Sequence, residues 1–276
     1  MTLSIIIVNY KNRELLKLCL QSLEQHVLPN IESEVLVVDS EAEAETAEMI
    51  REDFPKMQYL LEQNNVGYAK GVNRGLRKAQ GSYILILNPD IIVTSGTVET
   101  MLEFIKTNPE VGLVGPRLLN FDGSVQNSRF RFYRPSTILY RRSFLGKLPF
   151  GQKGLDRFHM KDVTSEEIAW PDWLMGSALL TTREAINKVG LLDERFFLYF
   201  EDVDWAKRFW ENGYKVAYLP KATMYHYLQR RSKAGLGPLD FFLRREARWH
   251  LQSAFKYFSK HGLNYHSGPE IFKHVR

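Results

Sequence analysis

An apolar run followed by a polar turn, Tyr83–Leu87 and then Asn88-Pro89-Asp90, constrains this chain more than any other feature. The continuous β-rich run suits a strand buried on both faces of a parallel sheet better than a half-exposed strand. Proline removes a ladder donor and the flanking Asn and Asp favour a turn, so a carboxylate lies just past the strand's carboxyl end. Open α/β sheets bind ligands there. Asp90 is therefore a candidate metal ligand facing a diphosphate, and an ordinary turn is the alternative interpretation.

Strands and helices alternate along the first 116 residues. Apolar runs predict strands at residues 3–8, 34–39, 57–61, 83–87 and 111–114, and helical spacing and composition predict helices at 13–26, 42–54, 68–79 and 96–107. Asn12 stands where it would cap the first helix. This order predicts an α/β fold with a mostly parallel, doubly wound, Rossmann-like sheet and helices on both faces.

The pattern changes in the second half of the chain. Residues 126–167 carry arginines, aromatics and glycines without sustained periodicity, which predicts a long functional or mobile excursion. Order returns with a turn and strand at 170–180, helices at 183–189 and from Glu201 to about 212, and strands at 215–219 and 222–227. A last, basic amphipathic helix is predicted at about 239–260.

Composition and charge set the expected compartment and partners. The chain has 276 residues, 44% hydrophobic and 25% charged, with no apolar run near the roughly 20 residues of a membrane-spanning helix and no signal-peptide start. We therefore expect a cytoplasmic protein. The net charge of +5 and sequence pI near 9.1 favour anionic partners such as nucleotides, phospholipid headgroups or nucleic acid. Cys19, the single cysteine, excludes internal disulfides and is expected to be a small core residue.

Acidic residues follow several predicted strands. Asp39 ends the second strand, and Glu201-Asp202 follow the mostly aromatic run Phe196–Phe200 at the start of a helix. Acids also stabilise helix N-termini, so a capping role is the alternative for this pair. A carboxylate beside an aromatic wall can have its pKa raised toward the working range of a base. His226, near the end of a predicted strand, is either a structural residue or a metal ligand.

Other polar residues and absent motifs narrow the class. Asn64, Asn65, Gly67 and Asn73 either surround a nucleotide or serve as turn and cap residues. The sequence has no GxGxxG after the first strand and no GxxxxGK[ST], which counts against dinucleotide-dependent oxidoreductases and P-loop NTPases. It also lacks CxxC, HExxH and the glycine-rich phosphate loop of sugar nucleotidyltransferases.

Motifs along residues 3–230 resemble, in their order, those of bacterial glycosyltransferase family 2, and most closely its rhamnosyltransferase-like branch. They are Ser4–Tyr10, Leu36–Asp39, Asn65–Ala69 with Asn73–Gly75, Leu87–Asp90, Gly115–Leu118, Trp173–Ser177 and Phe196–Asp204 with His226. The resemblance implies a GT-A fold and an inverting transfer from a nucleotide-diphosphate sugar to an acceptor hydroxyl. It also implies a divalent cation, Mg²⁺ or Mn²⁺, as cofactor.

The resemblance also assigns roles and boundaries. Residues 1–230 would form the catalytic domain, about 1–116 being its nucleotide-binding half and 117–230 its acceptor-side half, and 231–276 a basic amphipathic helical extension. Asp202 matches the catalytic base, with Glu201 orienting the acceptor, and Asp90 and His226 match the metal ligands. The donor would be bound by Asn9, Tyr10, Asp39, Asn65, Gly67, Asn73, Asn88 and Asp90. Trp173 and Gly176 would contact the acceptor, with Phe196–Phe200 adding an apolar platform for sugar rings.

Two positions depart from the family pattern. Asn88 stands where many members have aspartate, which leaves one carboxylate for the metal, and the basic residues Arg230, Arg231 and Lys233 are candidates to share the charge of the diphosphate. After Asp39 the usual small polar turn is replaced by the acidic run Ser40-Glu41-Ala42-Glu43. This run either changes the nucleoside contacts or is a solvated helix start.

Three functions stay open on this basis. The first is transfer of rhamnose from dTDP-rhamnose to a growing cell-surface polysaccharide or lipid-linked glycan. The second is transfer of another hexose or N-acetylhexosamine from a UDP-sugar, and the third is a silent nucleotide- or sugar-binding scaffold. A nucleic-acid partner is not expected. The C-terminal helix, with Trp249, Phe255, Phe258 and several arginines, is predicted to contact the inner face of the cell membrane, to pack on the catalytic domain, or to form a homodimer.

Overall fold

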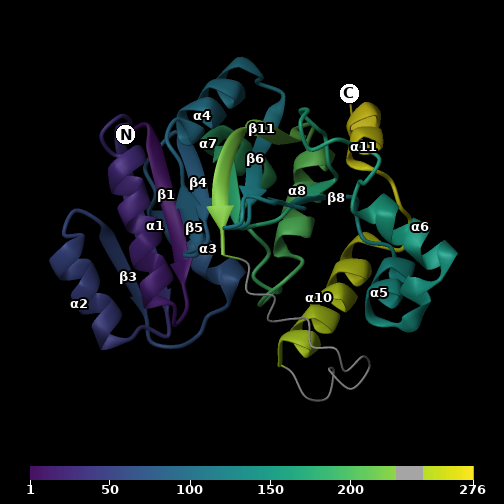
Figure 1. Cartoon of the computed structure of the whole chain (residues 1–276), viewed down its shortest axis with the longest axis horizontal. Coiled ribbons are helices and arrows are strands. Elements are labelled where there is room, and N and C mark those ends of the chain that lie inside the picture. The colour runs from purple at the N-terminus through teal and green to yellow at the C-terminus, as the bar shows by residue number, and fades with distance from the viewer. Residues whose placement is uncertain (228–244, 276) are drawn as a thin grey trace.

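The computed structural model describes residues 1–227 and 245–275. Its strands form one large sheet in the order β3-β2-β1-β4-β10-β6-β11-β5, with β7 paired to β6, and a two-stranded sheet of β8 and β9 (Figure 1). The N-terminal half carries β1 (Leu3–Asn9), α1 (Arg13–His26), β2 (Ser33–Ser40), α2 (Ala44–Asp53), β3 (Gln58–Glu62), α3 (Tyr68–Lys78), β4 (Tyr83–Leu87), β5 (Ile91–Val93) and α4 (Thr97–Thr107). The predicted mostly parallel α/β fold is confirmed.

The strands β3, β2, β1 and β4 pair in parallel and form the N-terminal part of the sheet. Every residue of β1 is buried, and so are all residues of β4 except Tyr83, because helices cover both faces. This is why their sequences read as continuous apolar runs. Asn12 occupies the N-cap position of α1, as predicted, but its side chain makes no capping hydrogen bond, so the predicted side-chain cap is absent.

The order changes beyond β4, where β10 (Ala178–Thr182) lies antiparallel between β4 and β6 (Val111–Leu119). The long strand β11 (Lys215–His226) runs parallel to β6 and carries β5 antiparallel at its end. Two separate strands were predicted at 215–219 and 222–227. They form one strand with an irregularity between Leu219 and Thr223, so the chain keeps its direction while the register shifts.

Residues 126–167 are more ordered than their sequence indicates. They hold β7 (Val125–Gln126), β8 (Arg129–Phe130), α5 (Pro135–Arg142), the 3₁₀ helix η1 (Phe144–Lys147) and α6 (Pro149–Phe158). Short helices with mixed faces give no sustained period, which explains why the sequence pattern missed them. β8 pairs with β9 (Trp173–Leu174), and the two are followed later in the chain by α7 (Arg183–Val189) and α8 (Glu201–Glu211).

The C-terminal segment packs on residues of the second half of the chain through α10 (Arg245–His261) and α11 (Gly268–Val275) (Figure 1). Buried Asp204 on α8 forms ion pairs with Lys260 at 2.6 Å and His261 at 2.7 Å. Buried Asp172 accepts a hydrogen bond from the Tyr265 hydroxyl at 2.9 Å. Helix α11 was not predicted. Residues 239–244 of the predicted last helix lie outside the described residues, as do Arg230, Arg231 and Lys233. None of the helices described at 1–227 and 245–275 is long and apolar enough to cross a membrane.

Candidate active site

The sheet brings the carboxyl ends of its parallel strands to one edge, and several predicted site residues lie there. Asn9 ends β1 and is the register partner of Asp39 near the end of β2. Asn88 follows β4, and its backbone N–H donates to the Ser177 carbonyl at 2.8 Å. The turn after β4 is thereby joined to the segment that precedes β10, so donor-side and acceptor-side candidates meet at this edge.

Asp39 is buried and fully bonded within the protein. Asn9 Nδ2 donates to one carboxylate oxygen at 2.8 Å and the Tyr59 hydroxyl to the other at 2.6 Å. Burial raises the pKa of Asp39, and these two hydrogen bonds oppose the rise. Asn9 Oδ1 is buried without a hydrogen-bond partner in the described part of the chain, so it is an acceptor left for a ligand N–H or hydroxyl. Tyr10, next along the chain, is exposed.

The loop before α3 is built around Asn65 and Gly67. Asn65 Oδ1 accepts from the Gly67 N–H at 3.0 Å, which closes a local turn. Gly67 has φ +80°, and a Cβ there would lie 2.5 Å from the Phe197 carbonyl oxygen. Glycine is therefore required for close approach of this loop to the segment that precedes Asp202.

Asn73 has a structural role in this fold. It is buried, its Nδ2 donates to the Leu192 carbonyl at 2.8 Å, and its Oδ1 accepts from the Leu192 N–H at 3.0 Å. Nδ2 also reaches Glu194 at 3.0 Å. The amide is thus bonded to Leu192 and Glu194, and its contact with a nucleotide stays a prediction.

Asp90 and His226 face one another, as predicted for a metal pair. Asp90 Oδ1 lies 3.5 Å from His226 Nε2, is itself buried, and has no hydrogen-bond partner among the described residues. The Tyr227 backbone N–H donates to the Asp90 carbonyl at 2.9 Å, which fixes the end of β11 beside the turn. Within residues 1–227 and 245–275 no group of three or more His, Cys, Asp and Glu side chains could hold a metal, so this pair would need ligands from a substrate.

Gln126 orients His226, and no sequence pattern pointed to this glutamine. Its Nε2 donates to the His226 carbonyl and to Asn120 Oδ1, both at 2.7 Å. Its Oε1 then faces His226 Nδ1 at 2.8 Å and accepts a hydrogen bond from the Nδ1–H. In the neutral imidazole this leaves the lone pair on Nε2, toward the Asp90 carboxylate, and two electron-rich atoms facing each other fit a shared cation.

Asp202 and Glu201 open helix α8, as predicted. Asp202 Oδ2 accepts from the Gly176 N–H at 3.1 Å and Oδ1 from the Val203 N–H at 2.9 Å. Burial raises the pKa of Asp202 to about 6, although both N–H donors oppose the rise. Burial and the neighbouring Asp202 charge raise the pKa of Glu201 well above its usual range. Glu201 Oε2 is buried with no partner in the described chain, so this oxygen is left for a ligand.

The backbone directly before Glu201 and Asp202 is strained. Tyr199 and Phe200 both have φ +69°, a conformation that non-glycine residues rarely adopt. Helix α10 packs against the segment: the Ser253 hydroxyl donates to the Leu198 carbonyl at 2.9 Å, and His250 lies edge-on to Phe200 at 5.2 Å between ring centroids. Burial lowers the pKa of His250 to about 3, so the ring is neutral. The C-terminal helix thus stabilises the conformation that presents Asp202.

Tyr68 joins the donor-side and acceptor-side groups and was missed by sequence reasoning. Its hydroxyl donates to the Gly176 carbonyl at 2.6 Å, while the N–H of Gly176 donates to Asp202. Burial raises the pKa of Tyr68 well above its usual range, with added contributions from the charges of Glu201, Asp202 and Asp90. These three acids therefore surround one neutral phenol.

Trp173 is buried rather than presented as a sugar platform. Its ring stacks on Phe130 at 4.5 Å between centroids, and its indole N–H donates to the Arg131 carbonyl at 2.9 Å. Phe196 and Phe200 are buried as well, so of the predicted platform only residues 197–199 are partly exposed. Trp173 therefore packs within the core next to the candidate site.

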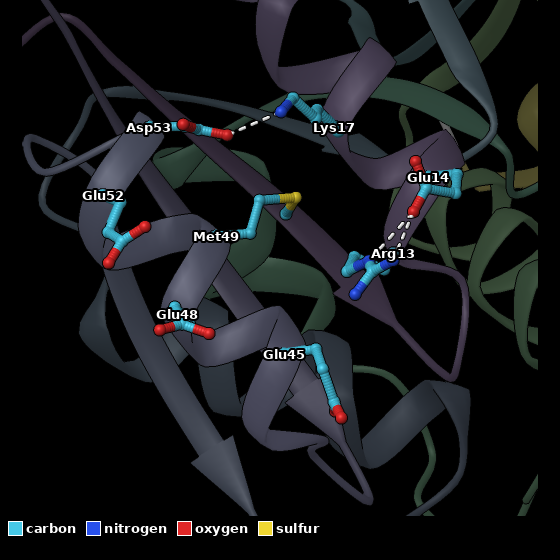
Figure 2. Close-up of a pocket in the computed structure, with 8 residues that line it drawn as sticks. All are labelled: Arg13, Glu14, Lys17, Glu45, Glu48, Met49, Glu52 and Asp53. Carbon is cyan, nitrogen blue, oxygen red and sulfur yellow. Dashed lines mark hydrogen bonds and ion pairs between the residues drawn. The ribbon is translucent and has the colours of Figure 1, made fainter.

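A groove between α1 and α2 is separate from these residues (Figure 2). Its volume is about 270 Å³, and its lining contains none of the predicted site residues. Five carboxylates and two cations line it, and Arg13–Glu14 and Lys17–Asp53 are ion pairs at 2.7 Å. Its excess negative charge is unfavourable for a diphosphate.

Comparison with known proteins agrees with this arrangement. The chain is similar to the N-acetylglucosaminyl-diphospho-decaprenol L-rhamnosyltransferase of Mycobacterium tuberculosis, 29% identical over 206 residues that span 70% of this chain and 66% of that protein. It is also similar to rhamnosyltransferase WbbL of Escherichia coli K12, 25% identical over 197 residues, or 71% of this chain and 69% of WbbL. The chain thus spans just under two thirds of the mycobacterial relative's length.

A solved structure shares the fold. The mannosyltransferase PcManGT from Pyrobaculum calidifontis, in complex with GDP-Man and Mn²⁺, superposes with a TM-score of 0.58 at 18% identity, over 99% of this chain and 78% of that one. The family model of glycosyl transferase family 2 matches residues 4–162, more than half of this chain. The chain therefore belongs to glycosyl transferase family 2 and has a GT-A type fold.

Proposed function

We propose that this glycosyltransferase moves a sugar, with inversion, from a nucleotide-diphosphate donor to a hydroxyl of a growing cell-surface polysaccharide or lipid-linked glycan. The observation that carries the proposal is the Asp202 carboxylate, held by two backbone N–H groups at the start of α8 with its pKa raised to about 6. The same edge of the sheet carries the Asp90–His226 pair.

Asp202 would act as the general base. A carboxylate with a pKa of about 6 is deprotonated at neutral pH and yet more basic than an ordinary aspartate. It would take the proton of the acceptor hydroxyl as that oxygen attacks the anomeric carbon, and the nucleoside diphosphate would leave from the opposite face. One base and one displacement give inversion.

Glu201 would orient the acceptor. Burial and the Asp202 charge raise the pKa of Glu201, which favours its protonated form, and its unpartnered Oε2 is placed to contact a substrate oxygen. Gly176 holds Asp202 through its N–H, and a Cβ added at this glycine would lie 3.3 Å from the Asp202 Cβ. Gly176 therefore keeps the base in place and leaves the acceptor side of it uncrowded.

Asp90 and His226 would hold a divalent cation together with oxygens of the donor diphosphate. The unpartnered Asp90 Oδ1 and the Nε2 lone pair that Gln126 leaves on His226 fit Mn²⁺ or Mg²⁺, and the imidazole favours Mn²⁺ of the two. When bound, such a cation stabilises negative charge on the leaving diphosphate. With Asn88 in place of aspartate, the pair supplies one carboxylate.

On the donor side, Asn9 Oδ1 and the exposed Tyr10 would contact the nucleoside, with Asp39 fixing Asn9. Rhamnose from dTDP-rhamnose is the first candidate, because two similar proteins are named as rhamnosyltransferases. A UDP-hexose is the second candidate, because a relative in Haloferax volcanii, 29% identical over 210 residues, is named as a hexosyltransferase.

Thermal stabilisation by nucleotides tests the donor class. We expect dTDP or UDP with Mn²⁺ to raise the melting temperature more than GDP or CMP, since a ligand at one hundred times its Kd stabilises by about 2.7 kcal/mol. Each nucleotide is also measured with Mg²⁺ and with a chelator. A null result with every nucleotide would favour a catalytically silent scaffold instead.

Product stereochemistry and an Asp202→Asn variant test the reaction. With the donor identified above, the anomeric proton coupling in the product should show inversion. Asp202→Asn should abolish transfer while nucleotide affinity stays within a few fold. Near-normal turnover by this variant would remove Asp202 as the base.

A further inference from the structure

We propose that the α5–η1–α6 hairpin, residues 135–158, is the surface by which this protein lies on an anionic lipid bilayer. The hairpin combines exposed aromatic and aliphatic side chains with a local excess of cations. Both features point to the same partner, because interfacial segments insert apolar side chains among lipid headgroups while basic residues meet the negative surface.

The apolar side chains are concentrated at the turn of the hairpin. Phe144 is 72% exposed, Phe150 55% and Leu139 52%, and Leu148 is exposed as well. These four are among fifteen exposed large hydrophobic side chains in residues 1–227 and 245–275, yet they lie within twelve residues. Such a concentration marks an interaction surface more than scattered single residues do.

The charge of this segment is mostly positive. Between Asp122 and Asp156 the sequence contains no acidic residue and seven basic ones, and Asp156, near the end of α6, is paired with Lys161 at 2.7 Å. Three of these, Arg129, Arg131 and Arg134, are wholly or partly buried, and Arg129 donates to a backbone carbonyl at 2.6 Å. Arg141, Lys147 and Lys153 are exposed on the same hairpin as the apolar side chains.

The helices and turns of the hairpin that carry these side chains are closely packed on one another. A Cβ at Gly146 or Gly151 would collide with the backbone of Tyr140 or Leu145, so the turns pack closely on one another. Tyr140 meets Phe150 edge-on at 5.9 Å between ring centroids. Figure 1 shows α5 and α6 at the outer edge of the fold, on the side opposite α2.

The hairpin also adjoins the acceptor side of the candidate site. α5 begins directly after Tyr133, whose ring packs against Phe200 at 4.6 Å and Trp173 at 5.7 Å between centroids. A bilayer against the hairpin would therefore lie beside the segment that carries Asp202. This placement suits a lipid-linked acceptor, and to that extent it rests on the proposed function.

The C-terminal helix α10 is less suited to the same role. Trp249 packs against Phe197 at 4.8 Å between centroids, and Phe258 packs against the core. Phe255, 75% exposed, is the large apolar side chain that α10 turns outward in its described residues. The predicted membrane face of this helix is thus largely used for packing, and Phe241 and Phe242 lie outside the described residues.

Vesicle sedimentation of the full chain tests the assignment without donor or acceptor. The vesicles are phosphatidylcholine alone or phosphatidylcholine with one third phosphatidylglycerol, at low salt. We expect binding to the anionic vesicles, a loss of about tenfold or more for Phe144→Ser with Phe150→Ser, and a loss of similar size for Lys147→Glu with Lys153→Glu. Phe255→Ser is the matched control and should bind as the unaltered protein does.

Each contrary outcome would overturn the proposal. Failure of the unaltered protein to bind anionic vesicles would do so, and so would loss of binding in Phe255→Ser alone. If the unaltered protein self-associates and does not bind vesicles, and Phe144→Ser with Phe150→Ser is monomeric, the surface would instead be an interface with a second copy of the chain. Unchanged melting temperatures establish that the variants fold. Because the assay contains no sugar donor, its failure leaves the proposed reaction standing.

Discussion

Replacing Asp202 by Asn should change how stability depends on pH, and in a direction set by the raised pKa. The pKa of Asp202 rises from 3.8 to about 6 on folding because the carboxylate is buried. A raised pKa in the folded state gives a contribution that is fully present below about pH 4 and is lost as pH rises through 6. At about 1.4 kcal/mol per pKa unit, the buried charge costs roughly 3 kcal/mol above pH 6.

Asn at position 202 keeps the acceptor for the Gly176 N–H and removes the charge. Relative to the unaltered protein, Asp202→Asn should therefore gain stability by about 2.5 kcal/mol between pH 4 and pH 7.5. Urea unfolding at several pH values measures this difference, with Asp162→Asn, a change at an exposed carboxylate, as the control. A difference between variant and parent that stays constant with pH would refute the raised pKa. In the unaltered enzyme, turnover should fall as pH drops below about 6.

Three further changes test other residues of the site. Gln126→Leu should weaken Mn²⁺ binding in the presence of nucleotide by about 10- to 100-fold, measured by titration, because His226 loses the group that fixes its tautomer; unchanged affinity would show that Gln126 does not orient the ligand. Gly67→Ala should lower the free energy of unfolding by about 1–3 kcal/mol, since φ is +80° and the Cβ would meet the Phe197 carbonyl; a neutral effect in urea unfolding would contradict the close approach. Asn73→Leu should lower the free energy of unfolding by about 2 kcal/mol or more and leave nucleotide affinity unchanged under conditions in which the variant is folded; a loss of nucleotide binding without a loss of stability would support its predicted role as a nucleotide contact.

The N-terminal half of the fold could be predicted from the sequence because its signals are local. Strands β1 and β4 are buried on both faces and read as continuous apolar runs, and the Asn-Pro-Asp turn after β4 lies where the sequence placed it. The start of α8 was likewise predicted at Glu201. In each case the residues that form the strand, turn or helix start are consecutive, so the sequence pattern and the interactions behind it lie in the same short stretch.

The rest of the site depends on contacts between distant residues. Gln126 meets His226 across 100 positions, and Tyr68 meets Gly176 across 108. A single glutamine or tyrosine gives no sequence pattern that announces such a partner. Asn73 shows the same limit: the sequence motif predicted a nucleotide contact, but its bond to Leu192, 119 positions away, had no sequence signal.

The C-terminal segment connects these observations, because the geometry around Asp202 depends on residues far beyond the motifs. Two successive positive φ angles at Tyr199 and Phe200 cost about 1–3 kcal/mol each, so surrounding contacts must hold them. Burial alone would raise the pKa of Asp204, but His261, Arg208 and Lys260 lower it overall, and of these three His261 and Lys260 tie α10 to α8. Helix α10 thus fixes the first turn of the helix that carries Asp202, and the described residues of the predicted 231–276 extension pack as part of the same fold.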